Sequence, residues 1–274
     1  MHNFIIRTLT GIVYVTLLVG SILLSPLAAF AFFALVSAAT LWEFGTVMNR
    51  HYQAQVARPV NALAGVLLAS AVWLHQAGAP NAGQQLALYG FTLLYLLVSE
   101  LYRKHPNPLR NWTLAFASQI YVAVPLALLP LLYFVEGGYT WVYVLALFVF
   151  IWVSDSGAYC FGSLLHKRFP AKLFERVSPN KSWVGSIGGA VLTLAVAALF
   201  ARWDASLSLI HWLGFALVVV VSGTWGDLVE SLLKRQLNIK DSGHVLPGHG
   251  GFLDRFDSAL LAIPATVIYF TLIG

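Results

Sequence analysis

The stretch WVYVLALFVFIWVSDSGAYCFG, from Trp141 to Gly162, decides the fold class. It opens with an unbroken apolar run up to Val153, and polar residues including Asp155 follow. A helix needs about 20 apolar residues to cross the hydrocarbon core of a bilayer. A helix also satisfies its own backbone hydrogen bonds, which lipid cannot do for it. The stretch therefore predicts a membrane-spanning helix with a charged residue near one end.

The rest of the chain has the same character. Of its 274 residues, 59% are hydrophobic and only 10% are charged, whereas a soluble domain carries about 25% charged residues. We predict an all-α, polytopic integral membrane protein with nine spans. The first is interpreted as a span, not as a signal peptide, because it is too long and more spans follow. The spans are 4–24, 27–48, 59–77, 83–101, 111–135, 140–162, 183–202, 207–229 and 255–273.

The basic residues predict the orientation in the membrane. If the N-terminus is cytoplasmic, 15 of the 16 Lys and Arg residues lie inside and only Arg202 lies outside. That asymmetry obeys the positive-inside rule and predicts that the polar residues face the cytoplasm. We expect the membrane to be a bacterial inner (cytoplasmic) membrane, with the active site facing the cytoplasm. The net charge of +5 is explained by this rule and by anionic lipid headgroups, so we expect no nucleic-acid partner. The single cysteine, Cys160, excludes an internal disulfide framework.

The two halves of the chain differ in their polar residues. Residues 1–110 hold charges almost only at span ends, and we interpret them as a scaffold of transmembrane helices. Glu43 and Glu100 are expected at the membrane interface, without a part in chemistry. Residues 111–274 carry the unusual polar residues and are predicted to form the catalytic part.

The segment GDLVESLLKR places polar residues on one helix face. Asp227, Glu230, Ser231 and Lys234 are spaced at i, i+3, i+4 and i+7. Ionisable residues within a span are costly and so are functional candidates, although a solvated helix end with an internal ion pair would show the same spacing. Asp155 and Tyr159 share a face of their own span, either lining a site or making structural polar contacts.

The polar segment KDSGHVLPGHGGFLDRFD, residues 240–257, precedes and enters the last predicted span. Asp254 and Asp257 lie in the first turn of that helix, where the helix dipole alone would favour them. Asp254 could also converge with Asp227 on a hard cation, and Mg²⁺ is typically held by one or two carboxylates with waters and phosphates. No H-x-x-x-H or C-x-x-C spacing supports zinc.

Two loops are predicted to bind phosphate. In the polar segment, glycines precede a helix N-terminus, where backbone N–H groups can approach an anion, although a flexible linker is the common alternative. Lys234, Arg235, Lys240 and Arg255 surround it with positive charge. In the loop SPNKSWVGSIGG, Lys181 is the candidate phosphate ligand, and Gly185 and Gly189 predict close helix packing. The Walker A pattern is absent.

These motifs resemble a known family. The run from Ser231 to Asp257 is similar to the signature of the phosphatidate cytidylyltransferases, or CDP-diacylglycerol synthases, S-x-x-K-R-x4-K-D-x-G-x3-P-x-H-G-G-x-x-D-R-x-D. The elements GDLVES, SPNKSWVG and DSGAY also resemble that family. One departure is Val184, where the family often has Glu or Gln, so no role is transferred to that position.

The resemblance implies that CTP and phosphatidate give CDP-diacylglycerol and pyrophosphate. It also implies a divalent metal held by Asp227 and Asp254, with K⁺ allowed as a second ion. CTP, phosphatidate and membrane lipids are the expected partners, and a homodimer is left open. The alternatives are a CTP-dependent lipid kinase and an ion-coupled transporter. The transporter is disfavoured because the polar residues gather at one membrane face and no repeat is visible.

We therefore predict two sets of site residues. The catalytic set is Lys181, Asp227, Lys240, Asp241 and Asp254. The substrate-binding set is Asp155, Tyr159, Ser178, Asn180, Ser182, Ser231, Lys234, Arg235, His249, Gly250, Gly251, Arg255 and Asp257. His249 would either orient its loop or contact phosphate.

Overall fold

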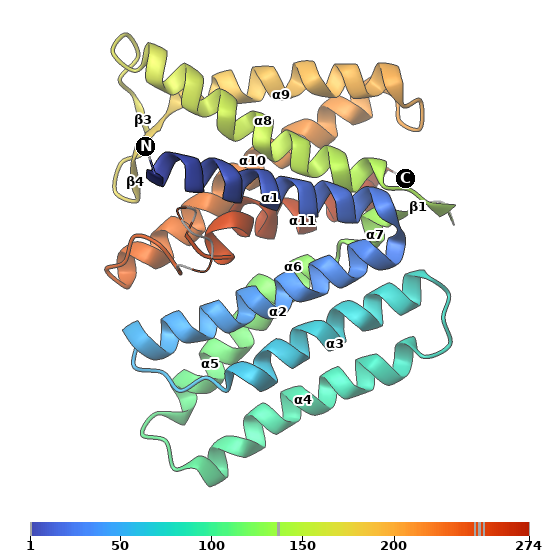
Figure 1. Ribbon diagram of the computed structural model, residues 1–274, viewed down its shortest axis with the longest axis vertical. Coiled ribbons are helices and arrows are strands. Elements are labelled where there is room, and N and C mark those ends of the chain that lie inside the picture. The colour runs from blue at the N-terminus through green and yellow to red at the C-terminus, as the bar shows by residue number, and fades with distance from the viewer. Residues whose placement is uncertain (1, 136–137, 244, 246–247, 249, 274) are drawn as a thin grey trace. The chain divides into compact units, whose positions relative to one another are not determined.

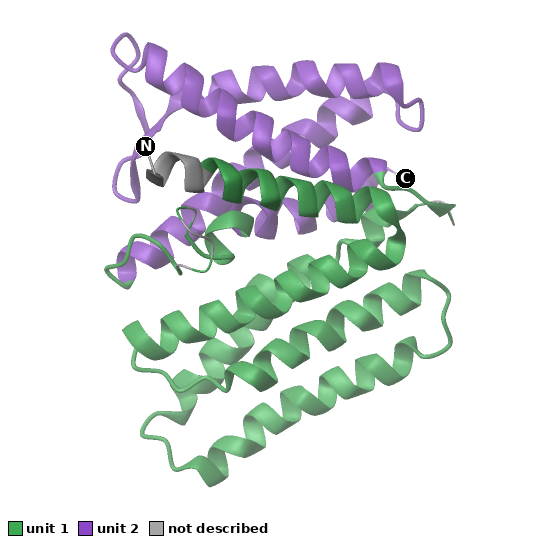
Figure 2. Cartoon of the chain, viewed as in Figure 1, with its two compact units in different colours: residues 1–141, 237–256 green, residues 142–236, 257–274 purple. Residues whose placement is uncertain are grey.

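The computed structural model describes residues 2–135, 138–243, 245, 248 and 250–273, with the backbone alone for residues 2–7 (Figure 1). The chain forms two compact units (Figure 2). Unit 1 is Met1–Trp141 with Leu237–Phe256, and unit 2 is Val142–Gln236 with Asp257–Gly274. This structural division differs from the functional division at residue 110, which stays a prediction.

Unit 1 is built from long helices joined by short turns (Figure 1). Proline lies in the first turn of α2, α3 and α5, where its missing N–H costs nothing. Ser25 caps α2, with its hydroxyl oxygen 3.1 Å from the Ala28 nitrogen. The elements are α1 His2–Leu24, α2 Pro26–His51, α3 Arg58–Gln76, α4 Ala82–Arg103, α5 Pro108–Ser118, η1 Gln119–Ala123, α6 Val124–Ala127, α7 Pro130–Tyr133, β1 Phe134–Val135 and β2 Gly138–Tyr139.

The predicted span 111–135 is a segmented helix. Its π-helical turn η1 lies between α5 and α6, and Pro125 and Pro130 each remove a backbone donor. Buried polar side chains support this irregular stretch. Asn61 donates from Nδ2 to the Ser118 hydroxyl at 2.6 Å, and Gln119 donates from Nε2 to the Asn61 carbonyl at 2.9 Å. Such bonds satisfy polar groups within an apolar core.

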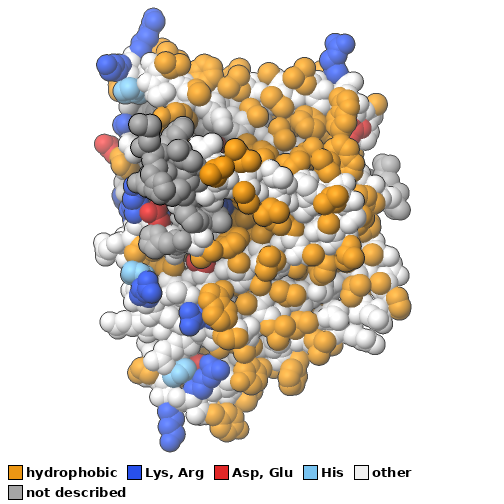
Figure 3. Space-filling model, in the orientation of Figure 1, with side chains coloured by type: hydrophobic (Ala, Val, Ile, Leu, Met, Phe, Trp, Pro, Cys, Tyr) orange, Lys and Arg blue, Asp and Glu red, His pale blue; other side chains and the backbone are white. Residues whose placement is uncertain are grey.

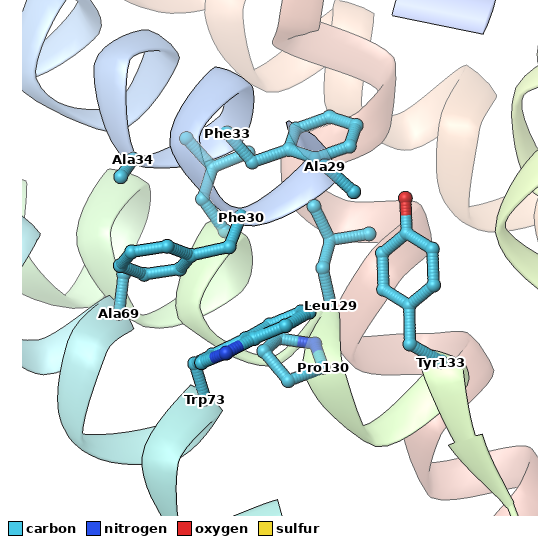
Figure 4. Close-up of a pocket in the computed structure, with 10 residues that line it drawn as sticks. Ala29, Phe30, Phe33, Ala34, Ala69, Trp73, Leu129, Pro130 and Tyr133 are labelled. Atoms are coloured by element: carbon cyan, nitrogen blue, oxygen red, sulfur yellow. The ribbon is translucent and has the colours of Figure 1, made fainter. Parts of the chain in front are cut away.

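An apolar pocket lies within unit 1 between α2, α3 and the α6–α7 region (Figure 4). The rings of Phe30 and Trp73 face it, with centroids 5.4 Å apart. Its other lining residues are aliphatic or aromatic, and Tyr133 supplies the one hydroxyl. A lining without charge or a nucleophile suits packing and not phosphoryl chemistry.

Unit 2 contains α8 Val142–Leu165, β3 Lys172–Phe174, β4 Ser178–Ser182, α9 Trp183–Trp203 and α10 Leu209–Gln236. It also contains most of α11 Leu253–Ile273, because the boundary between the units falls just before Asp257. Helices α8 and α9 run side by side (Figure 1). A Cβ at Gly189 would lie 2.5 Å from the Ser154 carbonyl oxygen, and one at Gly185 would lie 2.7 Å from that of Ala158. The predicted role of these glycines in close helix packing is confirmed.

The described chain has seven helical segments that are long and apolar enough to cross a membrane: Pro26–His51, Ala82–Arg103, Pro108–Tyr133, Val142–Leu165, Trp183–Trp203, Leu209–Gln236 and Leu253–Ile273. On the face shown in Figure 3, hydrophobic side chains cover much of the surface, and most of the visible Lys and Arg lie along the left side. The chain is an all-α polytopic membrane protein, as predicted.

The count of nine spans stays a prediction. All nine predicted ranges coincide with helical stretches, but two are not among the seven. Thr8–Leu24 is a shorter apolar helix among the described residues. In α3, Arg58, Asn61 and His75 add polar character that lowers the mean hydropathy.

Candidate active site

The site in unit 2 begins with an ion pair between Lys181 and Asp227. Lys181 lies on β4, and its Nζ is 2.6 Å from Oδ2 of Asp227 on α10. The segment around Lys181, predicted as a loop, instead contains β3 and β4, which form an antiparallel hairpin in which Lys172 pairs with Ser182. The hairpin fixes the backbone from which Lys181 extends.

The Ser182 hydroxyl has a structural role in this arrangement. It accepts a hydrogen bond from the Gly185 nitrogen at 3.3 Å and so caps the N-terminus of α9. Capping of this kind is typical of serine immediately before a helix. Ser182 therefore joins the hairpin to α9, while its predicted contact with substrate stays a prediction.

The polar face predicted on α10 is present. Ser231 donates from its hydroxyl to Oδ1 of Asp227 at 3.1 Å, and Lys234 forms an ion pair with Glu230 one turn along the helix. The Glu230 side chain has no exposed surface. A charge so deeply buried needs a close partner, which Lys234 provides. These contacts fix the Asp227 carboxylate between Ser231 and Lys181.

A close helix contact adds further acidic residues to this site. A Cβ at Gly226 would lie 2.5 Å from the Asp257 carbonyl oxygen, so only glycine allows α10 and α11 to approach here. The Asp257 carboxyl group interacts electrostatically with Asp227, Asp155 and Lys234. Asp155 therefore lies within electrostatic reach of Asp257, and its two interpretations, lining a site or making structural polar contacts, both stay predictions.

The other predicted site residues of unit 2 belong to α8, β4 and α10. Arg235 donates from Nε to the Val177 carbonyl oxygen at 3.4 Å, which ties the end of α10 to the hairpin. Ser178, at the start of β4, is half-buried, and Asn180, in the middle of that strand, is exposed. Tyr159 is 78% exposed on α8. An aromatic residue so exposed on a membrane helix is accessible to lipid as well as to a ligand.

In unit 1, the polar segment folds around the carboxylate of Asp254. Oδ2 of Asp254 accepts hydrogen bonds from the Ser242 nitrogen at 2.9 Å, the Ser242 hydroxyl at 2.8 Å and the Gly251 nitrogen at 2.8 Å. Gly250 has a φ of +80°, a conformation that favours glycine. The Gly251 N–H therefore binds a carboxylate of the protein. The predicted contact of Gly250 and Gly251 with substrate phosphate stays a prediction.

Glu43 is the functional candidate that sequence analysis missed. It was expected at the membrane interface, but it is only 6% exposed and contacts the polar segment. Its carboxylate accepts hydrogen bonds from the Phe252 nitrogen at 2.9 Å, the Leu253 nitrogen at 3.0 Å and the Ser242 hydroxyl. The sequence did contain a signal for Glu43: it is an ionisable residue inside the predicted span 27–48. The same feature made Asp155 a candidate.

Glu100 is a second buried carboxylate of unit 1, and its position near the membrane interface stays a prediction. It is 6% exposed, lies 3.0 Å from Nδ1 of His105 and accepts a hydrogen bond from Nδ2 of Asn111 at 2.9 Å. Oδ1 of Asn111 accepts from the Gln55 nitrogen at 2.8 Å. This network joins α4, α5 and the α2–α3 turn, which is a structural role.

The roles of the remaining predicted site residues stay predictions. Lys240, Asp241 and Arg255 are exposed, and His249 lies outside the described residues. Asp227 belongs to unit 2 and Asp254 to unit 1, so their joint binding of one metal ion stays a prediction. Within the described ranges, no three His, Cys, Asp or Glu side chains are grouped as a metal site.

The fold and the unit 2 site define a class: an all-α polytopic membrane protein with acidic and basic side chains gathered at the ends of its helices. Residues 5–273 match the model of the family described as the cytidylyltransferase family, and the chain belongs to that family.

Curated bacterial relatives support this membership. The chain is 46% identical over 146 residues to a phosphatidate cytidylyltransferase of Bacillus subtilis (strain 168), covering 51% of this chain and 52% of that protein. It is 44% identical over 123 residues to one of Staphylococcus aureus (strain COL), covering 44% and 46%. The chain thus aligns with about half the length of these relatives.

Lys181 provides a direct prediction about the site. Lys181→Ala removes the cation paired with Asp227. We expect the catalytic efficiency of the predicted cytidylyl transfer to fall about ten- to a hundredfold, which is the effect of losing a charge-assisted contact. Lys181→Arg should retain part of the activity because it keeps the charge. Steady-state kcat/KM of purified variants measures this. Lys172→Ala on the neighbouring strand, an exposed lysine, is the control, and equal kcat/KM for Lys181→Ala and wild type would contradict the prediction.

Proposed function

We propose that this protein transfers the cytidylyl group of CTP to phosphatidate, giving CDP-diacylglycerol and pyrophosphate. The observation that supports it best is the ordered ion pair of Lys181 and Asp227, supported by Ser231, in a chain of the cytidylyltransferase family. The relatives in Bacillus and Staphylococcus are named for this reaction. An ordered cation beside a group of carboxylates suits a reaction between two polyanions.

In the proposed reaction, a phosphate oxygen of phosphatidate attacks the α-phosphorus of CTP. The bond between that phosphorus and the oxygen bridging to the β-phosphorus breaks, and pyrophosphate leaves with the electron pair. Lys181 binds phosphate oxygens, and Asp227 orients Lys181 through their contact. Positioning and charge stabilisation are the main contributions to such a step, and no covalent protein intermediate is required.

The carboxylates suit a hard divalent cation. The Asp257 carboxyl group interacts electrostatically with both Asp227 and Asp155, and Mg²⁺ needs only one or two protein carboxylates when phosphates and waters complete its shell. Asp227 would hold Mg²⁺, with Asp254 as the second proposed ligand and K⁺ as an allowed second ion. When bound, the ion would neutralise phosphate charge.

The proposed site faces the cytoplasm of a bacterial inner membrane, with the N-terminus on that side. The distribution of basic residues supports this orientation. In a variant without Cys160, single cysteines at positions 172 and 240 should react with a membrane-impermeant maleimide only after the cytoplasmic face is opened. A cysteine at position 79, in the turn between α3 and α4, should react from outside. Labelling of position 240 in intact cells would overturn the orientation.

The proposed function is tested by asking which phosphorus of CTP is transferred to lipid. Purified protein with phosphatidate and Mg²⁺ should incorporate label from α-labelled CTP into lipid, while label from γ-labelled CTP should appear in pyrophosphate. A lipid kinase would transfer the γ label to lipid, and a transporter would transfer neither. Absence of lipid labelling by folded protein, with the Bacillus relative active in the same assay, would refute the proposed activity.

A further inference from the structure

The carboxylate of Glu43 holds the start of α11 from a distant helix. Glu43 belongs to α2, and it accepts from the N–H groups of Phe252 and Leu253, which are 209 and 210 residues away in the sequence. Because α11 begins at Leu253, these N–H groups have no partner within the helix. Glu43 therefore acts as an N-cap supplied by another helix, and its negative charge also suits the helix dipole.

The same carboxylate is connected to Asp254 through one hydroxyl group. Oγ of Ser242 lies 2.8 Å from Oδ2 of Asp254 and also contacts Oε1 of Glu43. The Ser242 nitrogen donates a second bond to Asp254. The Ser242 hydroxyl has one proton, which these two carboxylate oxygens share. Glu43, Ser242 and Asp254 thus form one connected group, and a change at Glu43 lies one contact away from Asp254.

The backbone at Gly243 and Gly251 lies against the Glu43 side chain. A Cβ at Gly251 would overlap the Glu43 carboxylate, and a Cβ at Gly243 would lie 2.7 Å from Oε2. These two glycines let the backbone wrap around the carboxylate on both sides. A glutamine would keep the size of the side chain but replace one acceptor with a donor, which would face a backbone N–H.

We propose that Glu43 is a positioning residue, which fixes the N-terminus of α11 and thereby the carboxylate of Asp254 for catalysis. The kinetic part of this proposal rests on the proposed function, whereas the structural part does not. Glu43 touches no reacting atom and acts through Ser242 and Asp254.

Hydrogen–deuterium exchange of the purified protein tests the structural part. In Glu43→Gln, amides in peptides covering residues 250–256 should exchange about tenfold faster or more, since a bond to a charged acceptor is lost. The control is Glu100→Gln, which removes an equally buried carboxylate on α4 and should leave these peptides unchanged. Ser242→Ala, which leaves α2 intact, should also accelerate exchange there. Unchanged exchange of residues 250–256 in Glu43→Gln would overturn the proposal.

Kinetics test the positioning part. Glu43→Gln should raise the Mg²⁺ concentration for half-maximal activity and lower kcat about tenfold or more, and Glu43→Asp, which keeps the charge, should recover part of both. Glu100→Gln should match wild type. Faster exchange in Glu43→Gln with wild-type kcat and Mg²⁺ dependence would overturn positioning. If Glu43→Gln exchanges faster but the wild-type protein transfers no cytidylyl group, the structural role of Glu43 is supported and the proposed function is refuted.

A double substitution separates the contact from general damage. Gly251→Ala should impair activity because its methyl group meets the Glu43 carboxylate. In a Glu43→Ala background that obstacle is gone, so adding Gly251→Ala should cost little more than Glu43→Ala alone. Additive losses from the two substitutions would show that the residues act independently and would count against the proposal.

Discussion

Asp227→Asn should abolish most cytidylyl transfer while the protein remains folded in membranes. The amide keeps the size of the side chain but loses the charge that pairs with Lys181 at 2.6 Å. It is also a weaker ligand for a hard cation than a carboxylate. Loss of groups that only support a metal ligand costs about ten- to a hundredfold, so we expect a proposed ligand to cost more than about a hundredfold.

The measurement is the initial rate of lipid labelling from α-labelled CTP across a range of Mg²⁺ concentrations. Asp204→Asn is the matched control, since Asp204 follows the far end of α9 and binds the Ser206 nitrogen at 2.9 Å. The melting temperatures of both variants should stay near that of wild type. Near-normal turnover by Asp227→Asn at limiting Mg²⁺ would refute its assignment.

Asp254→Asn should lose about as much activity as Asp227→Asn, because it too removes the negative charge of a proposed metal ligand. Its amide oxygen can still accept the bonds from Ser242 and Gly251, so this variant separates the charge from the scaffold of the polar segment. Normal turnover at limiting Mg²⁺ would remove Asp254 from the proposed ligands.

Gly189→Leu should prevent unit 2 from folding. The first side-chain carbon would lie 2.5 Å from the Ser154 carbonyl oxygen and 3.1 Å from the Ala158 nitrogen. Both are backbone atoms of α8, which cannot move aside by changing a rotamer. Overpacking costs about 1–3 kcal/mol where side chains can adjust, and we expect more here because two helices must separate.

Membrane accumulation and thermal unfolding in detergent measure this effect. Gly90→Leu in α4 is the control, because nothing lies within 4 Å of a Cβ at that position. Accumulation and melting of Gly189→Leu equal to those of Gly90→Leu would show that α8 and α9 are not held as closely as the structure has them.

The sequence by itself determined the fold class and the local polar faces. Long apolar runs leave the backbone no choice but helix in a bilayer, and each predicted run coincides with a helical stretch. The i, i+4 spacing predicted the Asp227–Ser231 and Glu230–Lys234 contacts, because helical periodicity alone brings these residues together. The signature from Ser231 to Asp257 likewise predicted the family.

Only the tertiary structure decided which distant residues meet. No local pattern shows that Lys181 on a hairpin would reach Asp227 on α10, or that Gly226 would admit the backbone of Asp257. Glu43 and Leu253 are 210 residues apart, and periodicity carries no information at that separation. The reason is physical: a buried carboxylate and an uncapped helix start each need a partner, and the folded chain supplies it from whichever segment packs nearby.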